Sequence, residues 1–598
     1  MELKTQVKAL NYTKKLLTGD TASILSWPAY PQKPIFRQSG RTMVPLPRAV
    51  PEEMGVDSSR LEKFIKKLAN IPAAQAHCVL VVRDGKLIME GDFSPYTAKL
   101  WHVSHSLCKS VVGIAVGLLV DKQLLKLDTP LSEIFPEYFN LFTPRRTRSI
   151  TVRHLLTMSS GINFREIGSL LEKDWLRSYF EADVLFEPGT QFDYNSMNTY
   201  VLGCIVAKLA QKSLTELLTE EVFGPLGFGP FEWETCPMGR EKAGWGLYLL
   251  PEDMAKLGLL LLNDGVWKST QGQEKRILSQ QWVEQMTTTQ MEGIQGTYGM
   301  QIWTLATGAF AMNGMFGQYV YCIPQNNTVI VLCSGSNNVF AQSPVLQLLQ
   351  EYFASEQMPA TLPLQPEKNS HLEEVLQRLE FGKPLKELPV VQPQPWYKSL
   401  LQKFVSTPQE PQCNPMEQTI LQQIENKTFY PEKNHVGILP LLVQCMQGNY
   451  TAGVDQMKFV STEEGIKLLW TEGKETIEMP LHFSTPQSFG LAIGGEKWKM
   501  ASVATATSNE DDVPVLKILL CFLEHTAVRR MKFFFYPEKT ILRMEETPSL
   551  MESLFQMRGT PQADLILDIF KDAGYARYRF ERFSGPEMEL FLQPPENK

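Results

Sequence analysis

The sequence predicts a two-part protein, an α+β domain followed by a mostly antiparallel β domain. In the first half, helix-period segments are mixed with strand pairs, and strands and helices do not alternate as βαβ units. From Pro384 to Pro415, seven prolines fall in 32 residues, a density that suits neither a helix nor a central strand. Beyond this stretch the chain changes to short β runs separated by turn-rich pieces such as 508–512.

The first half begins with a hairpin, because the apolar runs 78–82 and 87–89 are joined by the Asp84-Gly85 turn. The spacing of apolar residues then predicts helices at 106–123, 198–212, 251–263 and 279–287, and strands at 298–304, 318–323 and 328–333. These elements make an antiparallel sheet flanked by helices.

The second half contains β runs at 466–470, 475–481, 515–523, 526–536 and 541–545, which predict a barrel or a sandwich. We interpret the aromatic run 533–536 as β core rather than a ligand cage. The resulting organisation is an N-terminal extension (1–45), an α+β domain (46–355), a helix with the proline-rich linker (356–415) and a β-rich C-terminal domain (416–598).

Composition excludes several classes of protein. The 598 residues are 43% hydrophobic and 21% charged, as in globular chains. The net charge of −7 and the lack of a Lys/Arg-rich block argue against a nucleic-acid partner. Nine scattered cysteines form no Cys-x-x-Cys pair, so neither a disulfide framework nor a zinc ribbon is expected. Residues 1–17 lack an export-type apolar stretch, and the run 111–120 is too short to cross a bilayer, so we expect a cytoplasmic protein without a membrane partner.

The stretch around Ser106 carries the candidate chemistry. Ser106 stands at a helix start and Lys109 follows three residues later, which places the hydroxyl and the amine on one helical face. Partial desolvation lowers the pKa of an amine, and the helix N-terminus favours the alkoxide that forms when the serine loses its proton. Lys109 can therefore activate Ser106 as a nucleophile.

Tyr194 is the second candidate. It ends the loop 186–195 at the start of the next helix, where its phenol can face a cleft. Near Lys109 its pKa of about 10 is expected to fall, which would make the phenol a general base or a proton relay.

These residues resemble the serine hydrolases of the penicillin-recognising superfamily, which includes class C β-lactamases, D-aminopeptidases, family VIII esterases and 6-aminohexanoate-dimer hydrolases. The resemblance covers roughly residues 45–350. Besides Ser106-x-x-Lys109 and the Tyr194 segment, it rests on the stretches 50–56, 124–130, 150–161 and 246–258.

The resemblance implies the β-lactamase/transpeptidase-like fold, with a helical subdomain beside the sheet, and an acyl-enzyme on Ser106. It also implies an oxyanion hole formed by the backbone N–H groups of Ser106 and Met315. By the same resemblance, substrate would contact Asn195, Ser196, Asn313 and Gly314.

Two motifs depart from the family pattern. Ser196 stands where the second motif, Tyr-x-Asn, usually has its asparagine. The third motif, usually Lys-Thr-Gly or His-x-Gly, corresponds here to Met312-Asn313-Gly314, which has no cation at its first position. In lactamases and D,D-peptidases that cation helps to hold the substrate carboxylate, so its absence argues against a dedicated penicillinase.

Other chemistries have less support in the sequence. It contains no Gly-x-Ser-x-Gly elbow, His-Glu-x-x-His helix, Walker A loop or Gly-x-Gly-x-x-Gly motif. His102 and His105 flank Ser106, so a Ser-His pair is an alternative, and Cys108 is interpreted as a packed thiol. We expect a serine hydrolase or acyltransferase that acts on a small ester or amide with neither metal nor cofactor. The alternatives are a catalytically silent ligand-binding protein and a β-lactamase or D-aminopeptidase.

Overall fold

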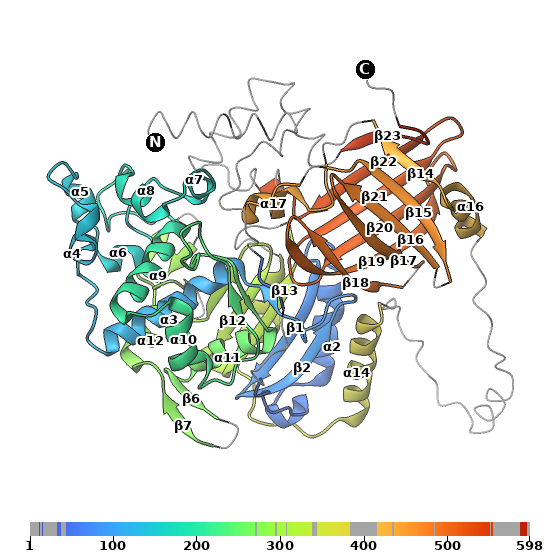
Figure 1. Cartoon of the computed structure of the whole chain (residues 1–598). Coiled ribbons are helices and arrows are strands. Elements are labelled where there is room, and N and C mark those ends of the chain that lie inside the picture. Colours follow the sequence, from blue (N-terminus) through green and yellow to red (C-terminus); the bar gives the residue numbers. More distant parts are fainter. Residues whose placement is uncertain are drawn as a thin grey trace.

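The computed structural model contains two large antiparallel sheets, one in each half of the chain (Figure 1). The structure describes residues 11, 15, 33–36, 43–269, 272–293, 296–305, 308–337, 344–382, 415–432, 436–451, 453–463, 465–483, 485–549, 552–553 and 586–594. Most of the predicted N-terminal extension, and the proline-rich stretch up to residue 414, lie outside the described residues.

The first sheet has eight strands, and each neighbouring pair runs antiparallel. Their order is β2 (Lys86–Asp92), β1 (Ala76–Arg83), β13 (Thr328–Ser334), β12 (Gln318–Ile323), β11 (Phe310–Gly314), β10 (Trp303–Thr304), β9 (Gly296–Tyr298) and β8 (Met291–Gly293). Smaller sheets combine β3 (His102–Val103), β5 (Leu247–Leu249) and β4 (Glu232–Trp233), and β6 (Val266–Lys268) with β7 (Glu274–Arg276).

Helices cover both faces of this sheet (Figure 1). Successive side chains of a strand point to opposite faces, so Val79 and Val81 of β1 pack with one group of helices and Leu80 and Val82 with another. The first group is α2 (Ser58–Ala69), α13 (Pro344–Leu349) and α14 (Pro366–Glu380), and the second includes α3 (Cys108–Asp121) and α11 (Pro251–Leu262). The apolar run 78–82 of β1 is therefore buried on both sides.

Helix α14 lies in the segment that the sequence analysis placed with the linker. Its Leu372, Val375 and Leu379 pack into the core formed by α2 and the sheet. Because these side chains are buried there, α14 is part of the first domain rather than a spacer between the two halves.

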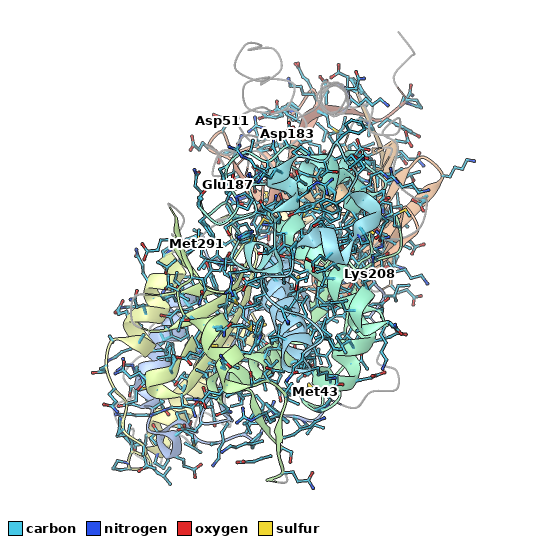
Figure 2. All side chains as sticks on the ribbon, turned by 90° about the vertical axis from the view of Figure 1, so that its left-hand side faces the viewer. Met43, Asp183, Glu187, Lys208, Met291 and Asp511 are labelled. Atoms are coloured by element: carbon cyan, nitrogen blue, oxygen red, sulfur yellow. The ribbon has the colours of Figure 1, made fainter. Side chains whose placement is uncertain are left out.

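A helical subdomain lies beside the sheet, on the left in Figure 1. It contains α4 (Leu131–Ile134), α5 (Arg145–Arg148), α6 (Val152–Leu156), α7 (Glu166–Leu171), α8 (Trp175–Glu181), α9 (Ser196–Ala210), α10 (Leu214–Leu218) and α12 (Gln280–Thr287). Figure 2 views the molecule from this side, with Asp183, Glu187 and Lys208 labelled. Helices α3 and α9 pack together, so the subdomain and the sheet share one core.

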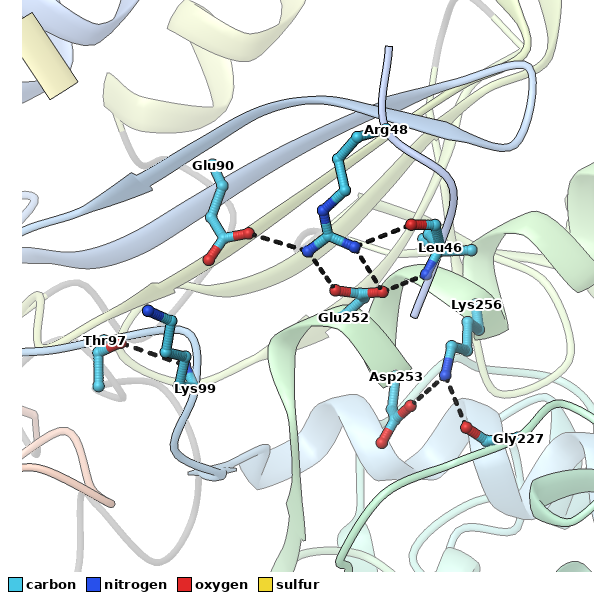
Figure 3. A network of polar contacts seen from close by, with 9 residues as sticks. All are labelled: Leu46, Arg48, Glu90, Thr97, Lys99, Gly227, Glu252, Asp253 and Lys256. Carbon is cyan, nitrogen blue, oxygen red and sulfur yellow. Dashed lines mark hydrogen bonds and ion pairs between the residues drawn. The ribbon is translucent and has the colours of Figure 1, made fainter. Parts of the chain in front are cut away.

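The start of α11 anchors the segment that enters the first domain (Figure 3). Glu252 accepts hydrogen bonds from the Leu46 N–H and from Arg48, with an Arg48–Glu252 distance of 3.0 Å. One turn further on, Lys256 Nζ pairs with Asp253 at 2.7 Å and donates to Gly227 O at 2.8 Å. Acidic side chains in the first turn of a helix are stabilised by the helix dipole. Here Glu252 also joins α11 to the segment 46–48, and Asp253 with Lys256 joins it to the segment at Gly227.

The second sheet has ten strands. Their order is β17 (Glu475–Leu481), β16 (Gly465–Glu472), β15 (Gln456–Thr462), β14 (Thr428–Pro431), β23 (Glu587–Phe591), β22 (Thr540–Thr547), β21 (Val528–Phe535), β20 (Pro514–Phe522), β19 (Glu496–Ser508) and β18 (Gln487–Ile493). The end strands β17 and β18 also contact each other, so the sheet curls into a nearly closed barrel. Helices α16 (Pro415–Ile424) and α17 (Leu441–Gln447) accompany it.

These observations confirm the predicted fold class, and of the two shapes expected for the second half the barrel is found. Phe533 and Phe535 are buried in the barrel core, as interpreted. Phe534 alternates with them and faces the other way, where it stacks on Tyr536 and lies beside Arg543. Only half of the aromatic run is therefore core.

Within the part of the chain that the structure describes, no helix is both long enough and apolar enough to cross a membrane. The eight cysteines described there are buried and none forms a disulfide. The same residues contain no group of three or more side chains that could hold a metal ion.

Candidate active site

Ser106 lies on a sharp turn between strand β3 and helix α3. The turn is a short 3-10 helix, His105–Leu107, that leads directly into α3. His105 adopts φ +47°, a left-handed conformation that costs a non-glycine residue free energy and persists only when its surroundings hold it. Ser106 itself is partly accessible, while its neighbours 104, 105 and 107 are buried. The turn therefore leaves Ser106 partly accessible while the residues around it are buried.

Lys109 lies beneath Ser106, as the helical spacing predicts. Its Nζ is 2.8 Å from Ser106 Oγ and also donates to the backbone carbonyl of Gly244 at 2.7 Å. The side chain is 1% exposed, and this burial lowers the pKa of Lys109 to about 8, with Glu166 opposing the shift. Burial disfavours the ammonium form, so an appreciable fraction of neutral amine is present near neutral pH.

Tyr194 completes the cluster from the loop before α9. Its ring lies 5.0 Å from Lys109 Nζ and is stacked on Trp303, with ring centroids 5.6 Å apart. The expected lowering of its pKa is not found, because burial raises the pKa of the phenol and its interaction with the Ser106 hydroxyl opposes this only in part. Tyr194 is thus a protonated phenol at neutral pH, suited to donate or relay a proton rather than to act as a phenolate base.

The sequence analysis placed Asn195 in substrate binding, but its side chain has a structural role. Asn195 Oδ1 accepts from Met197 N at 2.9 Å, which caps α9, and Nδ2 donates to the carbonyls of Ile162 and Phe164. The residue is 1% exposed, so both ends of its amide are engaged inside the protein. Ser196 is also buried, and its backbone N–H donates to Glu166 Oε1 at 3.0 Å.

The segment 313–315, where β11 ends, lies against the Ser106 turn. A Cβ on Gly314 would lie 2.3 Å from the carbonyl oxygen of Ser104, so only glycine permits this approach. Among the described residues, the backbone N–H of Met315 has no acceptor within the protein. The Asn313 side chain is partly accessible. The edge of the sheet therefore brings a backbone donor beside the nucleophile turn, which an oxyanion hole requires.

The two flanking histidines face away from the Ser106–Lys109 pair. His102 is paired with His77 at 3.0 Å, and His105 Nε2 contacts Thr526 Oγ1 at 3.3 Å. Burial lowers the pKa of His102 to about 4 and that of His105 to about 3. The Cys108 thiol is buried and donates to Ala243 O, consistent with a packed thiol.

Gly244 was not identified from the sequence, although its carbonyl binds Lys109. A Cβ on Gly244 would lie 2.6 Å from Ser196 O, so the chain approaches the α9 start closely there. The available signal was the Gly-Trp-Gly run at 244–246, since closely spaced glycines outside a hairpin often mark such an approach. Trp303, which stacks on Tyr194, had no motif around it.

An antiparallel sheet flanked by helices, with a helical subdomain and a Ser-x-x-Lys pair at a strand-to-helix turn, defines the β-lactamase-like class of serine hydrolases. Residues 61–345 match the family model "Beta-lactamase". The match confirms the resemblance inferred from the motifs.

Individual relatives are distant. Protein flp of Staphylococcus aureus (strain COL) is 26% identical over 175 residues, which are 26% of this chain and 34% of that protein. A β-lactamase of Escherichia coli (strain K12) is 26% identical over 155 residues, 25% of this chain and 40% of that enzyme. The chain thus spans about a third of the length of the first relative. A solved structure of a putative 6-aminohexanoate-dimer hydrolase from Bacillus anthracis aligns with 56% of this chain and 89% of its own, at 22% identity and a TM-score of 0.44.

Proposed function

We propose that this protein is a serine hydrolase or acyltransferase that cleaves an ester or amide through an acyl-enzyme on Ser106. The observation that carries the proposal is the 2.8 Å contact between Lys109 Nζ and the partly accessible Ser106 hydroxyl. The lowered pKa of Lys109, about 8, supplies a base near neutral pH. Neither a metal nor an organic cofactor has a role in this chemistry.

In the proposed reaction, neutral Lys109 accepts the proton of Ser106 while Oγ attacks the substrate carbonyl carbon. The backbone N–H groups of Ser106 and Met315 stabilise the oxyanion of the tetrahedral intermediate. When the intermediate collapses, the bond to the leaving group breaks and that group takes a proton through the Tyr194 hydroxyl. Water or another nucleophile then attacks the acyl-enzyme, which regenerates Ser106.

The proposed substrates are neutral, because Met312 occupies the position where the family usually has a cation. A charge-assisted contact to a substrate carboxylate contributes about 1.5–3 kcal/mol, and a site without it should favour carboxylate-bearing substrates by about tenfold or less. Short-chain esters or amides should therefore exceed penicillins and D-Ala-D-Ala peptides in kcat/KM. We propose that Asn313 and Gly314 contact these substrates. Ser196 lies against Gly244, so its proposed role is to position the segment whose carbonyl binds Lys109.

Covalent labelling tests the nucleophile. Intact-mass spectrometry after incubation with a fluorophosphonate or p-nitrophenyl butyrate should show one adduct, which Ser106→Ala abolishes. The matched control is Ser110→Ala, which removes a buried serine hydroxyl one helical turn away that donates to Gln301 O. Equal labelling of Ser106→Ala and the native protein would reject the assignment, and so would loss of labelling in both variants.

Substrate preference separates the proposed hydrolase from a β-lactamase. Nitrocefin and p-nitrophenyl acetate and butyrate are compared on one preparation in one buffer. Efficient nitrocefin turnover beside negligible esterase activity would contradict the neutral-substrate proposal. The second candidate, a catalytically silent protein that binds a ligand in the cleft, predicts no adduct and no turnover with any of the probes.

The proposed location is the cytoplasm. The eight described cysteines are all buried and free, which fits a reducing compartment. Fractionation of cells that express the full chain tests this, and recovery outside the cytoplasm would contradict it.

A further inference from the structure

The C-terminal barrel touches the first domain at the chain segment that carries Ser106. The contact is made by the turn between β20 and β21, residues 523–527, hereafter the barrel turn. Glu524, His525, Thr526 and Ala527 of this turn are each no more than 1% exposed. Such complete burial of polar side chains at a boundary between two domains calls for specific partners.

Glu524 binds the strand that leads to Ser106 through two bonds. Its backbone carbonyl accepts from Val103 N at 3.0 Å, and its Oε1 accepts from Trp101 Nε1 at 2.6 Å. Its other carboxylate oxygen pairs with Lys33 Nζ at 2.8 Å and accepts from Lys499 N at 2.9 Å. The buried carboxylate is therefore compensated on both oxygens, and it fixes the barrel turn against β3.

Thr526 reaches the residue next to the nucleophile. Its hydroxyl lies 3.3 Å from His105 Nε2 and 3.3 Å from His525 Nδ1, so it can donate to one ring and accept from the other. The rings of His105 and His525 meet edge to face, with centroids 5.4 Å apart. His105 Nδ1 has no partner among the described residues, so Thr526 is the only described hydrogen-bond partner of this imidazole.

His105 needs external support because of its backbone conformation. Its left-handed φ of +47° sets the direction in which the next residue, Ser106, leaves the strand. The first domain holds one side of the turn through Ser104, whose N–H and hydroxyl both bond Leu247 O at 2.8 Å. The barrel turn holds the other side through Glu524 and Thr526.

The barrel also supports the loop that binds Lys109. Gln447, at the end of α17, donates to Glu234 Oε1 at 2.8 Å, and Glu234 Oε2 binds Lys242 at 2.8 Å. Lys242 lies two residues before Gly244, whose carbonyl accepts from Lys109. The C-terminal domain therefore contacts both the strand that leads to Ser106 and the loop whose carbonyl binds Lys109.

We propose that the C-terminal barrel is a working part of the active site, in which Thr526 is a positioning residue that holds the Ser106 turn through His105. This inference deepens the proposed function and rests on it. It assigns the second domain a role in the chemical step rather than in binding a separate partner.

The test replaces Thr526 in the full chain. Thr526→Val keeps the side-chain volume but removes the hydroxyl, whereas Thr526→Ser keeps the hydroxyl. We expect Thr526→Val to lower kcat for p-nitrophenyl butyrate, and the rate of fluorophosphonate labelling, by about tenfold to 100-fold with KM within about threefold, because a nucleophile displaced by a fraction of an ångström reacts slowly. Thr526→Ser should stay within about threefold of the native protein.

Thr328→Val is the matched control. Thr328 is an equally buried threonine whose hydroxyl donates to Asn326 O at 2.9 Å, at the end of β13 remote from Ser106. The same substitution there should change stability but leave kcat unaltered. If Thr526→Val does not fold, the comparison is made between Thr526→Ala and Thr526→Ser.

The outcomes are distinguishable from failure of the proposed function. If the native protein forms no Ser106 adduct, the hydrolase proposal fails. If the native protein is labelled and Thr526→Val is labelled at the same rate, only the positioning role is overturned. An equal loss of kcat in Thr526→Val and Thr526→Ser, or in Thr328→Val, would overturn it as well, since packing rather than the hydroxyl bridge would then be responsible.

Discussion

Raising the pH from 7 to 9 should speed the acylation of Ser106 by roughly tenfold and then have little further effect. The reason is the environment of Lys109, whose burial lowers its pKa to about 8. A base acts only in its neutral form, so the rate should follow the fraction of unprotonated amine.

The magnitude follows from that pKa. About 9% of Lys109 is neutral at pH 7, about half at pH 8 and about 91% at pH 9. A solvated lysine with a pKa near 10.4 would be about 0.04% neutral at pH 7, and the rate would rise roughly a hundredfold by pH 9 without a plateau. The position of the plateau therefore reports the burial of this side chain.

The assay is the pseudo-first-order rate of fluorophosphonate labelling between about pH 6 and about pH 10.5 at constant ionic strength, with circular dichroism at each pH to verify the fold. Lys109→Arg is the control, because arginine keeps the positive charge and does not deprotonate in this range. It should be slower by roughly 10²–10⁴ and lose the inflection.

Two results would refute the reasoning. A rate that still rises about tenfold between pH 8 and pH 9 would show that Lys109 is solvated in the working enzyme. An inflection near pH 6.5 that persists in Lys109→Arg would assign the base to a histidine such as His102. That result would contradict the structure, in which His102 is paired with His77.

Three further predictions concern single residues. Tyr194→Phe should lower kcat by roughly 10²–10⁴ with a smaller change in KM, measured by steady-state ester hydrolysis, and near-normal turnover would remove the phenol from proton transfer. Gly314→Ala places a Cβ 2.3 Å from a backbone oxygen, so urea unfolding should show a free energy of unfolding lower by about 1–3 kcal/mol, and fluorophosphonate labelling should be slower. Gly490→Ala is the control, because the space around Gly490 is open and the substitution should change neither quantity. The pKa of His102 in the folded protein is about 4, so on acidification the unfolded chain takes up a proton at this residue before the folded protein does. Between pH 6.5 and about 4, His102 should therefore lower the free energy of unfolding by up to about 3 kcal/mol. The loss of stability on acidification should be smaller in His102→Gln, and an identical loss in both proteins would contradict this.

The elements of the fold could be predicted largely from local patterns. The continuous apolar run of β1, and the Asp84-Gly85 turn after it, depend on neighbours a few residues away, and both appear in the structure. The closure of the second sheet into a barrel could not be predicted in this way, because it depends on β17 meeting β18 across a sheet of ten strands.

The same division holds within the candidate site. The sequence by itself determined that Ser106 and Lys109 meet, because a three-residue spacing on a helical turn brings two side chains together in any fold. Only the tertiary structure decided that Lys109 binds Gly244, that Asn195 is a helix cap, that burial raises the pKa of Tyr194, and that Thr526 supports His105. These properties arise where segments up to several hundred residues apart meet, and from the burial of side chains between them. A local sequence pattern determines neither which distant segments meet nor how deeply a side chain is buried.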